Sequence, residues 1–207
     1  MSRIGVDESG KGDYFGPLVV AACYVDEGIE KKLAGVLESK ELTDESALKW
    51  AERIKSVAPY SIHTLMPEKY NAAHAQLKNL NVMLAYGHAR CIEDLLDGRE
   101  VEKVVSDQFA NPKLLRSKLH EKGRQTNFVS MVRAESDLAV AAASVIARAE
   151  FLLKLRELSD KFAIELPKGA TTVIPTALKF VRAYGAEKLG EVAKTHFRTT
   201  KKVLDQH

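Results

Sequence analysis

The chain has 207 residues, 45% of them hydrophobic and 29% charged, which is the composition of an ordinary globular domain with a sizeable core. No apolar run approaches the roughly 20 residues of a membrane-spanning helix, so we expect no membrane insertion. The two cysteines, Cys23 and Cys91, form no C-x-x-C pair, which argues against a cysteine zinc site and fits a reducing, cytoplasmic location.

The N-terminal half alternates between short apolar runs and helical periodicity. Thr43 or Asp44 is expected to cap one of its helices, and Gly98 to end the last. In chain order the predicted elements are strands over 2–7 and 17–25, a helix over 27–37, a helix ending near 57, a strand over 59–66, a helix from 67 and a helix over 80–96.

The C-terminal half contains a segment that is apolar on all sides, 138–147, which predicts a central, buried helix continuing to about 161. The other predicted elements are strands over 101–106 and 126–132, a helix over 112–121 closing at Gly123, and short helices over 175–205 broken at Gly185 and Gly190. This order predicts an α/β fold, a mixed sheet flanked by helices with a helical C-terminal part, in one domain over 1–207.

Two adjacent acids, Asp7 and Glu8, follow the first apolar run and precede a glycine-rich loop with Gly10, Lys11 and Gly12. Unpaired buried carboxylates are strongly disfavoured, so a cation should neutralise them, and hard divalent ions prefer carboxylate oxygens. The segment also fits the phosphate-loop pattern G-x-x-x-x-G-K, but Gly12 stands where that loop needs Ser or Thr for magnesium. A metal site is therefore favoured over a nucleotide loop.

Further acids follow other predicted strands: Asp107 comes after one, and Glu135 and Asp137 come after another. Ligands gather at the carboxyl ends of strands in such sheets, so these acids should meet Asp7 and Glu8. Two divalent ions would neutralise the cluster and could clamp a phosphodiester. Neighbouring strand residues point to opposite faces, so both N-terminal acids can serve only if the backbone turns just after them. Alternatively, Asp107 is a turn residue and Asp137 a helix N-cap.

Several other side chains allow two interpretations. His88, on a helical stripe, is favoured as a packed histidine over a metal ligand. His196 could contact phosphate or lie on the surface. Tyr14 and Phe15 could stack on a sugar or base, or fold the loop inward.

Charge is unevenly distributed. From 168 to 207 there are eight Lys or Arg against three acids, a local +5, so the remainder carries −2 of the overall +3. A basic part facing an acidic, metal-binding part suits an enzyme acting on a phosphate backbone, although a solvated helix face explains the charges equally well.

The segment from Asp7 to Pro17, Asp-Glu-Ser-Gly-Lys-Gly-Asp-Tyr-Phe-Gly-Pro, resembles the opening motif of ribonuclease HIII, in the type 2 branch of the ribonuclease H families. The resemblance covers nearly the whole chain. Other segments that resemble the family, in the family's order, are 39–43, 79–81, 106–109, 139–148, 166–169 and 196–200.

This resemblance implies a ribonuclease H-like fold and endonucleolytic cleavage of the RNA strand in RNA/DNA hybrids, with Mg²⁺ or Mn²⁺ as cofactor, two ions with substrate, and products ending in 5′-phosphate and 3′-hydroxyl. It implies Asp7, Glu8 and Asp107 as catalytic metal ligands, with Glu135 first and Asp137 second as the fourth catalytic acid. The substrate-binding residues would be Gly10, Lys11 and Gly12 at the 2′-hydroxyl, and Ser39, Lys40 and Lys168 at phosphates. No obligate protein partner is implied, and we expect a monomer.

Two departures qualify the resemblance. Lys11 and Ala170 stand where the related ribonuclease HII has an arginine and a junction-sensing tyrosine, which favours ribonuclease HIII and weak activity at a single embedded ribonucleotide. The N-terminal TBP-like substrate-binding domain usual in ribonuclease HIII is expected to be missing. The alternatives are ribonuclease HII-like cleavage at single ribonucleotides and a non-catalytic hybrid-binding protein.

Overall fold

The computed structural model describes residues 1–33, 43–107, 112–131 and 134–206. They group into two compact units. The first, the sheet unit, comprises Met1–Glu8, Val20–His63 and Leu80–Ala149, and the second, the helical unit, comprises Ser9–Val19, Thr64–Asn79 and Glu150–His207. The expectation of one domain stays a prediction.

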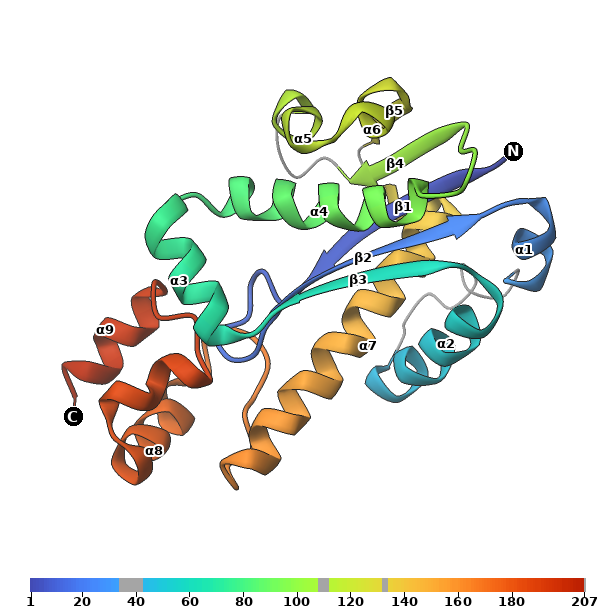
Figure 1. Ribbon diagram of the computed structural model, residues 1–207. Coiled ribbons are helices and arrows are strands. Elements are labelled where there is room, and N and C mark those ends of the chain that lie inside the picture. Colours follow the sequence, from blue (N-terminus) through green and yellow to red (C-terminus); the bar gives the residue numbers. More distant parts are fainter. Residues whose placement is uncertain (34–42, 108–111, 132–133, 207) are drawn as a thin grey trace. The chain divides into compact units, whose positions relative to one another are not determined.

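A five-stranded sheet with the order β3-β2-β1-β4-β5 carries the fold. β1 pairs in parallel with β4, and β4 in parallel with β5, whereas Figure 1 shows β2 running opposite to β1. The predicted mixed sheet is therefore confirmed. The strands are β1 (Arg3–Ser9), β2 (Leu18–Val25), β3 (Tyr60–Leu65), β4 (Lys103–Asp107) and β5 (Asn127–Met131).

Side-chain caps start some of the helices. Thr43, rather than Asp44, caps α2, since its hydroxyl oxygen accepts a hydrogen bond from Ser46 N at 3.1 Å. The helices are α1 (Glu27–Lys32), α2 (Asp44–Val57), α3 (Pro67–Leu77), α4 (Leu80–Leu96), α5 (Pro112–Lys118), α6 (Glu121–Gln125), α7 (Leu138–Lys161), α8 (Ile174–Tyr184) and α9 (Arg198–Leu204), with 3₁₀ turns η1 (Ala134–Ser136) and η2 (Ala186–Glu191).

Two glycines let helices lie directly on the sheet. A Cβ at Gly5 of β1 would overlap backbone atoms of Ala139 and Val140, so the first turns of α7 touch the strand itself. A Cβ at Gly87 of α4 would lie 2.8 Å from Val20 Cγ2 on β2. Figure 1 shows α4 and α7 on opposite faces of the sheet. The predicted burial of the start of α7 is confirmed, because Ala139 and Val140 are buried.

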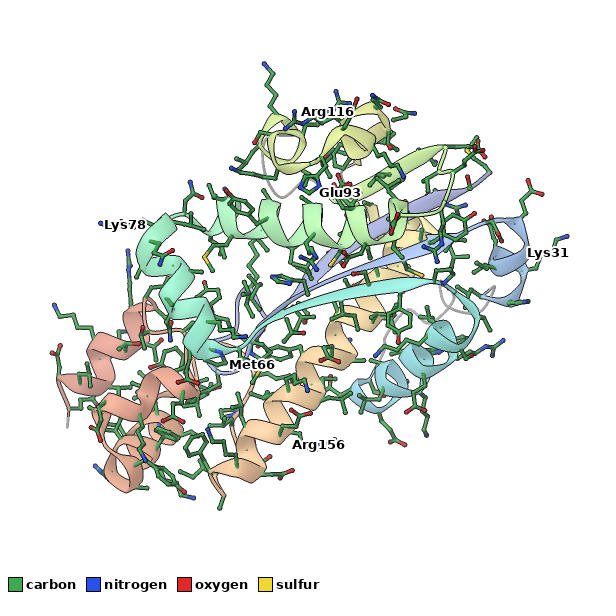
Figure 2. The ribbon with its side chains drawn as sticks, in the orientation of Figure 1. Lys31, Met66, Lys78, Glu93, Arg116 and Arg156 are labelled. Carbon is green, nitrogen blue, oxygen red and sulfur yellow. The ribbon has the colours of Figure 1, made fainter. Side chains whose placement is uncertain are left out.

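The prediction of one helix over 112–121 that closes at Gly123 is wrong at the C-terminal end. The chain forms two helices instead, and Gly123 lies inside α6 rather than closing a helix. Glu93 on α4, labelled in Figure 2, explains this: its carboxylate accepts a hydrogen bond from His120 N at 2.7 Å and starts α6. A Cβ at Gly123 would overlap that same carboxylate, so a larger residue there would displace the Glu93 side chain.

The helical unit is held by aromatic packing. The rings of Phe162, Phe180 and Tyr184 lie 5.0–5.1 Å apart, centre to centre. Gly185 ends α8 as predicted, with φ of +89°, a conformation that favours glycine. Gly190 does not break a helix, because it lies within η2.

We predict that Gly5→Ala lowers the free energy of unfolding by about 3 kcal/mol or more, because neither backbone can move aside. Urea denaturation measures the change. Gly28→Ala is the matched control: its Cβ would meet only Asp26 Oδ1 at 3.4 Å, and in α1 alanine should stabilise by up to about 1 kcal/mol. Equal effects of the two substitutions would contradict the close packing of α7 on β1.

Candidate active site

The two adjacent acids lie within β1, which runs to Ser9 and is therefore longer than predicted. They contact helices on opposite faces of the sheet. Asp7 accepts a hydrogen bond from the Ser144 hydroxyl on α7, and Glu8 contacts His88 on α4. This alternation is what a regular strand imposes on neighbouring residues.

The carboxyl group of Asp7 is costly to ionise. Burial, and after it the negative charge of Glu8, raise its pKa from 3.8 to about 6. Hydrogen bonds from Glu8 N, at 2.8 Å, and from Ser144 act in the other direction. The interaction with His88 also lowers the pKa, but burial and Glu8 outweigh these effects.

Glu8 has a partner on α4. Its Oε2 lies 2.9 Å from Nε2 of His88, and the two side chains are only 11% and 1% exposed. The prediction that His88 is packed is confirmed, but the sequence argument missed its contact with a candidate catalytic acid. A polar residue in the middle of an apolar helical stripe was the available signal, since buried polar groups almost always have a partner.

Asp107 is the last residue of β4, as its predicted place at a strand end requires. The register pairs Val6 of β1 with Ser106 of β4, so Asp7 and Asp107 are the next residues on two neighbouring parallel strands. Such strands lie about 4.8 Å apart. The backbones of Asp7 and Asp107 are therefore brought to the same edge of the sheet, while the Asp107 side chain lies outside the described atoms.

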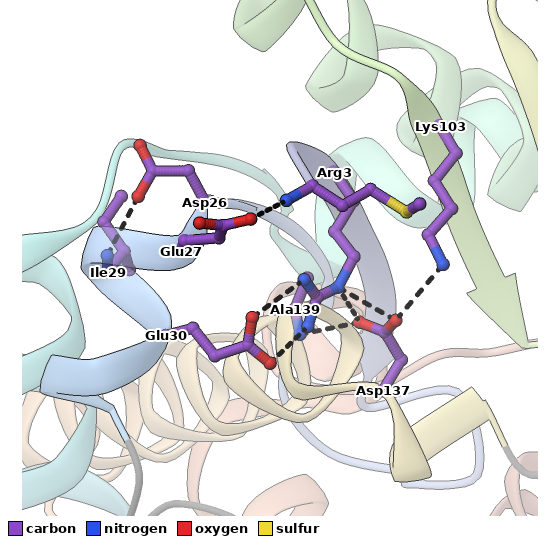
Figure 3. Close-up of polar contacts among 9 residues, drawn as sticks. Arg3, Asp26, Glu27, Ile29, Glu30, Lys103, Asp137 and Ala139 are labelled. Atoms are coloured by element: carbon purple, nitrogen blue, oxygen red, sulfur yellow. Dashed lines mark hydrogen bonds and ion pairs between the residues drawn. The ribbon is translucent and has the colours of Figure 1, made fainter.

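Asp137 has a different environment (Figure 3). Its carboxylate accepts hydrogen bonds from Arg3 Nε at 3.0 Å and from Ala139 N at 2.9 Å, and it lies 4.0 Å from Lys103 Nζ. Arg3 begins β1, at the opposite end from the two acids. The N-cap interpretation is confirmed, and this geometry gives Asp137 an ion-pairing and capping role. Glu135 lies in η1 with its side chain outside the described atoms, and its role as the fourth acid stays a prediction.

The predicted substrate loop belongs to the helical unit. Gly10 has φ of +86°, and a Cβ there would overlap the carbonyl oxygen of Pro17, so this glycine is required by the fold. Gly12 differs, because a Cβ there would face open space. Gly169 N donates to Asp13 Oδ1 at 2.7 Å, which brings the loop beside the segment carrying Lys168.

The aromatic residues of the loop are folded inward. Tyr14 and Phe15 are completely buried, and the Tyr14 hydroxyl lies 3.0 Å from Thr200 Oγ1. The alternative in which they stack on nucleic acid is therefore wrong.

His196 is on the surface, with its ring 4.0 Å from that of His74.

Ser39 and Lys40 lie outside the described residues. Within the described side chains, no three of His, Cys, Asp or Glu gather as a metal-binding group. Among the described helices, none has the length and apolar character needed to cross a membrane.

Comparison with known proteins decides the family. The model of the family described as Ribonuclease HII matches residues 4–200. The chain belongs to the ribonuclease HII family. It is accordingly a ribonuclease H enzyme, as predicted.

Curated members of this family with similar sequences are named Ribonuclease HIII. The protein of Protochlamydia amoebophila is 43% identical over 205 residues, covering 98% of this chain and 68% of the relative. That of Chlamydia felis is 40% identical over 209 residues, covering 98% and 70%. The predicted resemblance to ribonuclease HIII is thus confirmed.

Solved structures of the family agree with the fold. Bst-RNase HIII, in a crystal structure with Mn²⁺, is 38% identical and superposes with a TM-score of 0.92 over 100% of this chain and 70% of that one. The predicted ribonuclease H-like fold is therefore confirmed.

We predict that Asp7→Asn stabilises the metal-free protein at pH 7. A carboxyl whose pKa is raised by folding contributes stability below its unfolded pKa and loses it as pH rises through the folded value, here from 3.8 to about 6. The asparagine removes this penalty, so the gain should be on the order of 2 kcal/mol at pH 7 and vanish below about pH 4.

Thermal melts of both proteins between pH 4 and 8, with EDTA, provide the measurement. Asp97→Asn, at an exposed aspartate of the same unit, is the control for the substitution itself. A gain at pH 7 that persisted unchanged at pH 4 would show that the effect is not titration of Asp7.

Proposed function

We propose that this chain is an endonuclease that hydrolyses the RNA strand of RNA/DNA hybrids by two-metal-ion catalysis, leaving 5′-phosphate and 3′-hydroxyl ends. The observation that carries the proposal is the arrangement at the end of β1, where the partly buried Asp7 and Glu8 adjoin the end of β4 with Asp107. Family membership provides the reaction class, and this edge provides acids of the kind that reaction needs.

The residues at this edge fit a divalent cation. Asp7 and Glu8 offer hard oxygen donors, and the raised pKa of Asp7 reflects the cost of keeping its carboxylate charged in a buried position. Asp7, Glu8 and Asp107, with Glu135, would hold Mg²⁺ or Mn²⁺. When bound, such ions activate water and stabilise the leaving oxygen of a phosphodiester. A relative, Bst-RNase HIII, was crystallised with Mn²⁺.

The surrounding side chains orient the ligands. The Ser144 hydroxyl and Glu8 N fix the direction of the Asp7 carboxylate, and His88 fixes that of Glu8. Partners of this kind restrict the rotation of metal-binding carboxylates and tune their basicity. Asp7 and Glu8 are thereby held before any ligand arrives.

We assign hybrid recognition to residues 10–16, called the glycine loop below, and to the basic C-terminal part. Gly10, Lys11 and Gly12 would follow the minor groove and its 2′-hydroxyl groups, with Lys168 at a phosphate. The open space at Gly12 supports this role, because the fold itself does not require a glycine there. Ser39 and Lys40 remain proposed phosphate contacts, and a monomer in the cytoplasm remains our expectation.

The decisive experiment compares two labelled duplexes: an all-RNA strand on DNA, and a DNA duplex with one ribonucleotide. Each is incubated with Mg²⁺, with Mn²⁺ and with EDTA. We expect metal-dependent cutting at many positions of the first and little cutting of the second. Asp7→Asn should abolish cleavage yet still bind the hybrid, whereas the control Asp97→Asn should cleave normally.

Other outcomes would overturn parts of the proposal. Efficient cutting 5′ of the single ribonucleotide would indicate ribonuclease HII-like activity. Hybrid binding without cleavage of either duplex would indicate a binding protein. A kinase labels only a free 5′-hydroxyl end. Downstream fragments that it labels without prior phosphatase treatment would therefore contradict the 5′-phosphate product.

A pair of glycine substitutions tests the substrate loop. We predict that Gly12→Ala weakens hybrid binding about tenfold while changing the free energy of unfolding by less than about 0.5 kcal/mol, because the added methyl meets no protein atom but would meet the hybrid. Gly10→Ala should lower stability instead, by more than about 1 kcal/mol.

Fluorescence anisotropy of labelled hybrid, in EDTA, and urea denaturation give the two quantities. Unchanged affinity in a folded Gly12→Ala protein would remove Gly12 from the proposed binding surface.

A further inference from the structure

Lys194 is a lysine with no exposed surface, in the interior of the helical unit. A buried ammonium group is disfavoured unless its hydrogens are satisfied. Its Nζ donates to the carbonyl oxygen of Asp13 at 2.9 Å and to that of Gly16 at 2.8 Å. It also lies 5.6 Å from the ring centre of Tyr70 on α3, within range of a cation–π interaction.

The hydrogen-bond acceptors of Lys194 are main-chain carbonyls of the glycine loop. In addition to the two bonds from Nζ, Lys194 N donates to the carbonyl oxygen of Tyr14 at 2.8 Å. One residue therefore holds carbonyls on three residues of a single short segment. The neighbouring Ala193 pairs with Phe15 as an isolated antiparallel bridge, which extends the same contact.

The other side of the segment is fixed by Gly169. Its N–H donates to Asp13 Oδ1 at 2.7 Å, and its carbonyl oxygen accepts from Tyr14 N at 2.8 Å. Gly16 N adds a bond to the carbonyl oxygen of Val192 at 2.9 Å. Hydrogen bonds on both sides thus hold the backbone of residues 13–16, and the neighbouring Lys11 and Gly12 are exposed.

The electrostatic surroundings show that packing alone does not explain a lysine here. Burial lowers the pKa of Lys194 to about 7, and the charge of Asp13 opposes that shift only in part. The pKa of His196 is lowered to about 4 by partial burial, by the nearby His74 and, third, by the positive charge of Lys194. An apolar side chain would avoid these costs but could not donate to two converging carbonyls.

We propose that Lys194 is a positioning residue for hybrid binding, holding the carbonyls of Asp13 and Gly16 so that Lys11 and Gly12 are presented in a fixed conformation. This inference rests on the proposed role of the glycine loop. Without these contacts, hybrid binding would have to order the loop. The entropic cost of that ordering would make the binding free energy less favourable.

The test uses Lys194→Met, which keeps the length of the side chain and removes its donors. We expect hydrogen exchange of amides in residues 10–16 to accelerate at least about tenfold, since their carbonyl anchors are lost. The KM for the all-RNA hybrid should rise about tenfold with kcat changed less than about threefold, because the loop binds substrate and does not touch the reacting bond. The Mn²⁺-induced rise in melting temperature should be unchanged.

Lys161→Met is the matched control. It removes the same charge from the same unit, at an exposed lysine paired with Glu191 at 2.9 Å, and should alter neither exchange nor KM. Lys194→Gln is the second variant should methionine prevent folding: it keeps an amide N–H₂ donor without the charge, and intermediate effects on exchange and KM are expected.

Two results would overturn the proposal. Faster exchange in the loop with an unchanged KM would show that loop order does not govern hybrid binding. A raised KM with unchanged exchange would show that Lys194 acts by charge alone. Failure of the proposed function is distinguishable, because the wild-type chain would then not cleave the hybrid while the exchange experiment would still report on the loop.

Discussion

The direct contact of α7 with β1 at Gly5 is the constraint on which the candidate site depends. Because no side chain separates the strand from Ala139 and Val140, the helix backbone lies at a fixed depth against the sheet. Asp7 lies two residues after Gly5 on the strand, and Ser144 lies five residues after Ala139 on α7. The same contact therefore brings the Ser144 hydroxyl to the Asp7 carboxylate. Any larger residue at position 5 would displace the helix and this hydrogen bond together.

Charge balance is the second constraint. β1 places Asp7 and Glu8 on opposite faces, where Asp7 meets the Ser144 hydroxyl and Glu8 meets His88. The pKa of Asp7, about 6, is raised first by burial and then by the charge of Glu8. At the opposite end of β1, Arg3 pairs with Asp137 at 3.0 Å, so the acid there is already neutralised. One end of the strand is balanced within the protein, whereas the other is suited to an added cation.

The glycine loop follows a different principle, in which distant segments fix a short backbone. Asp13 and Gly16 are held by Lys194, and Gly169 contributes from a third part of the chain. Burying an ammonium group is unfavourable, but two carbonyls and the Tyr70 ring compensate it. The glycines within the loop are not equivalent, since Gly10 is required by its own backbone conformation and Gly12 is not.

The sequence by itself determined the strands and helices with strong periodicity, the mixed sheet, the family and the places of Asp7, Glu8 and Asp107 at strand ends, because these follow from local patterns and a specific motif. It left Asp137 open between helix cap and catalytic acid, and it misjudged Gly123, Gly190 and the surroundings of His88. Only the tertiary structure decided Asp137, Gly123 and His88, since each of these depends on a partner far away in the chain: Arg3 for Asp137, Glu93 for Gly123 and Glu8 for His88. Lys194 shows the same limit, because a lysine in a basic segment carries no local sign that it will be buried against the carbonyls of a loop 181 and 178 residues away.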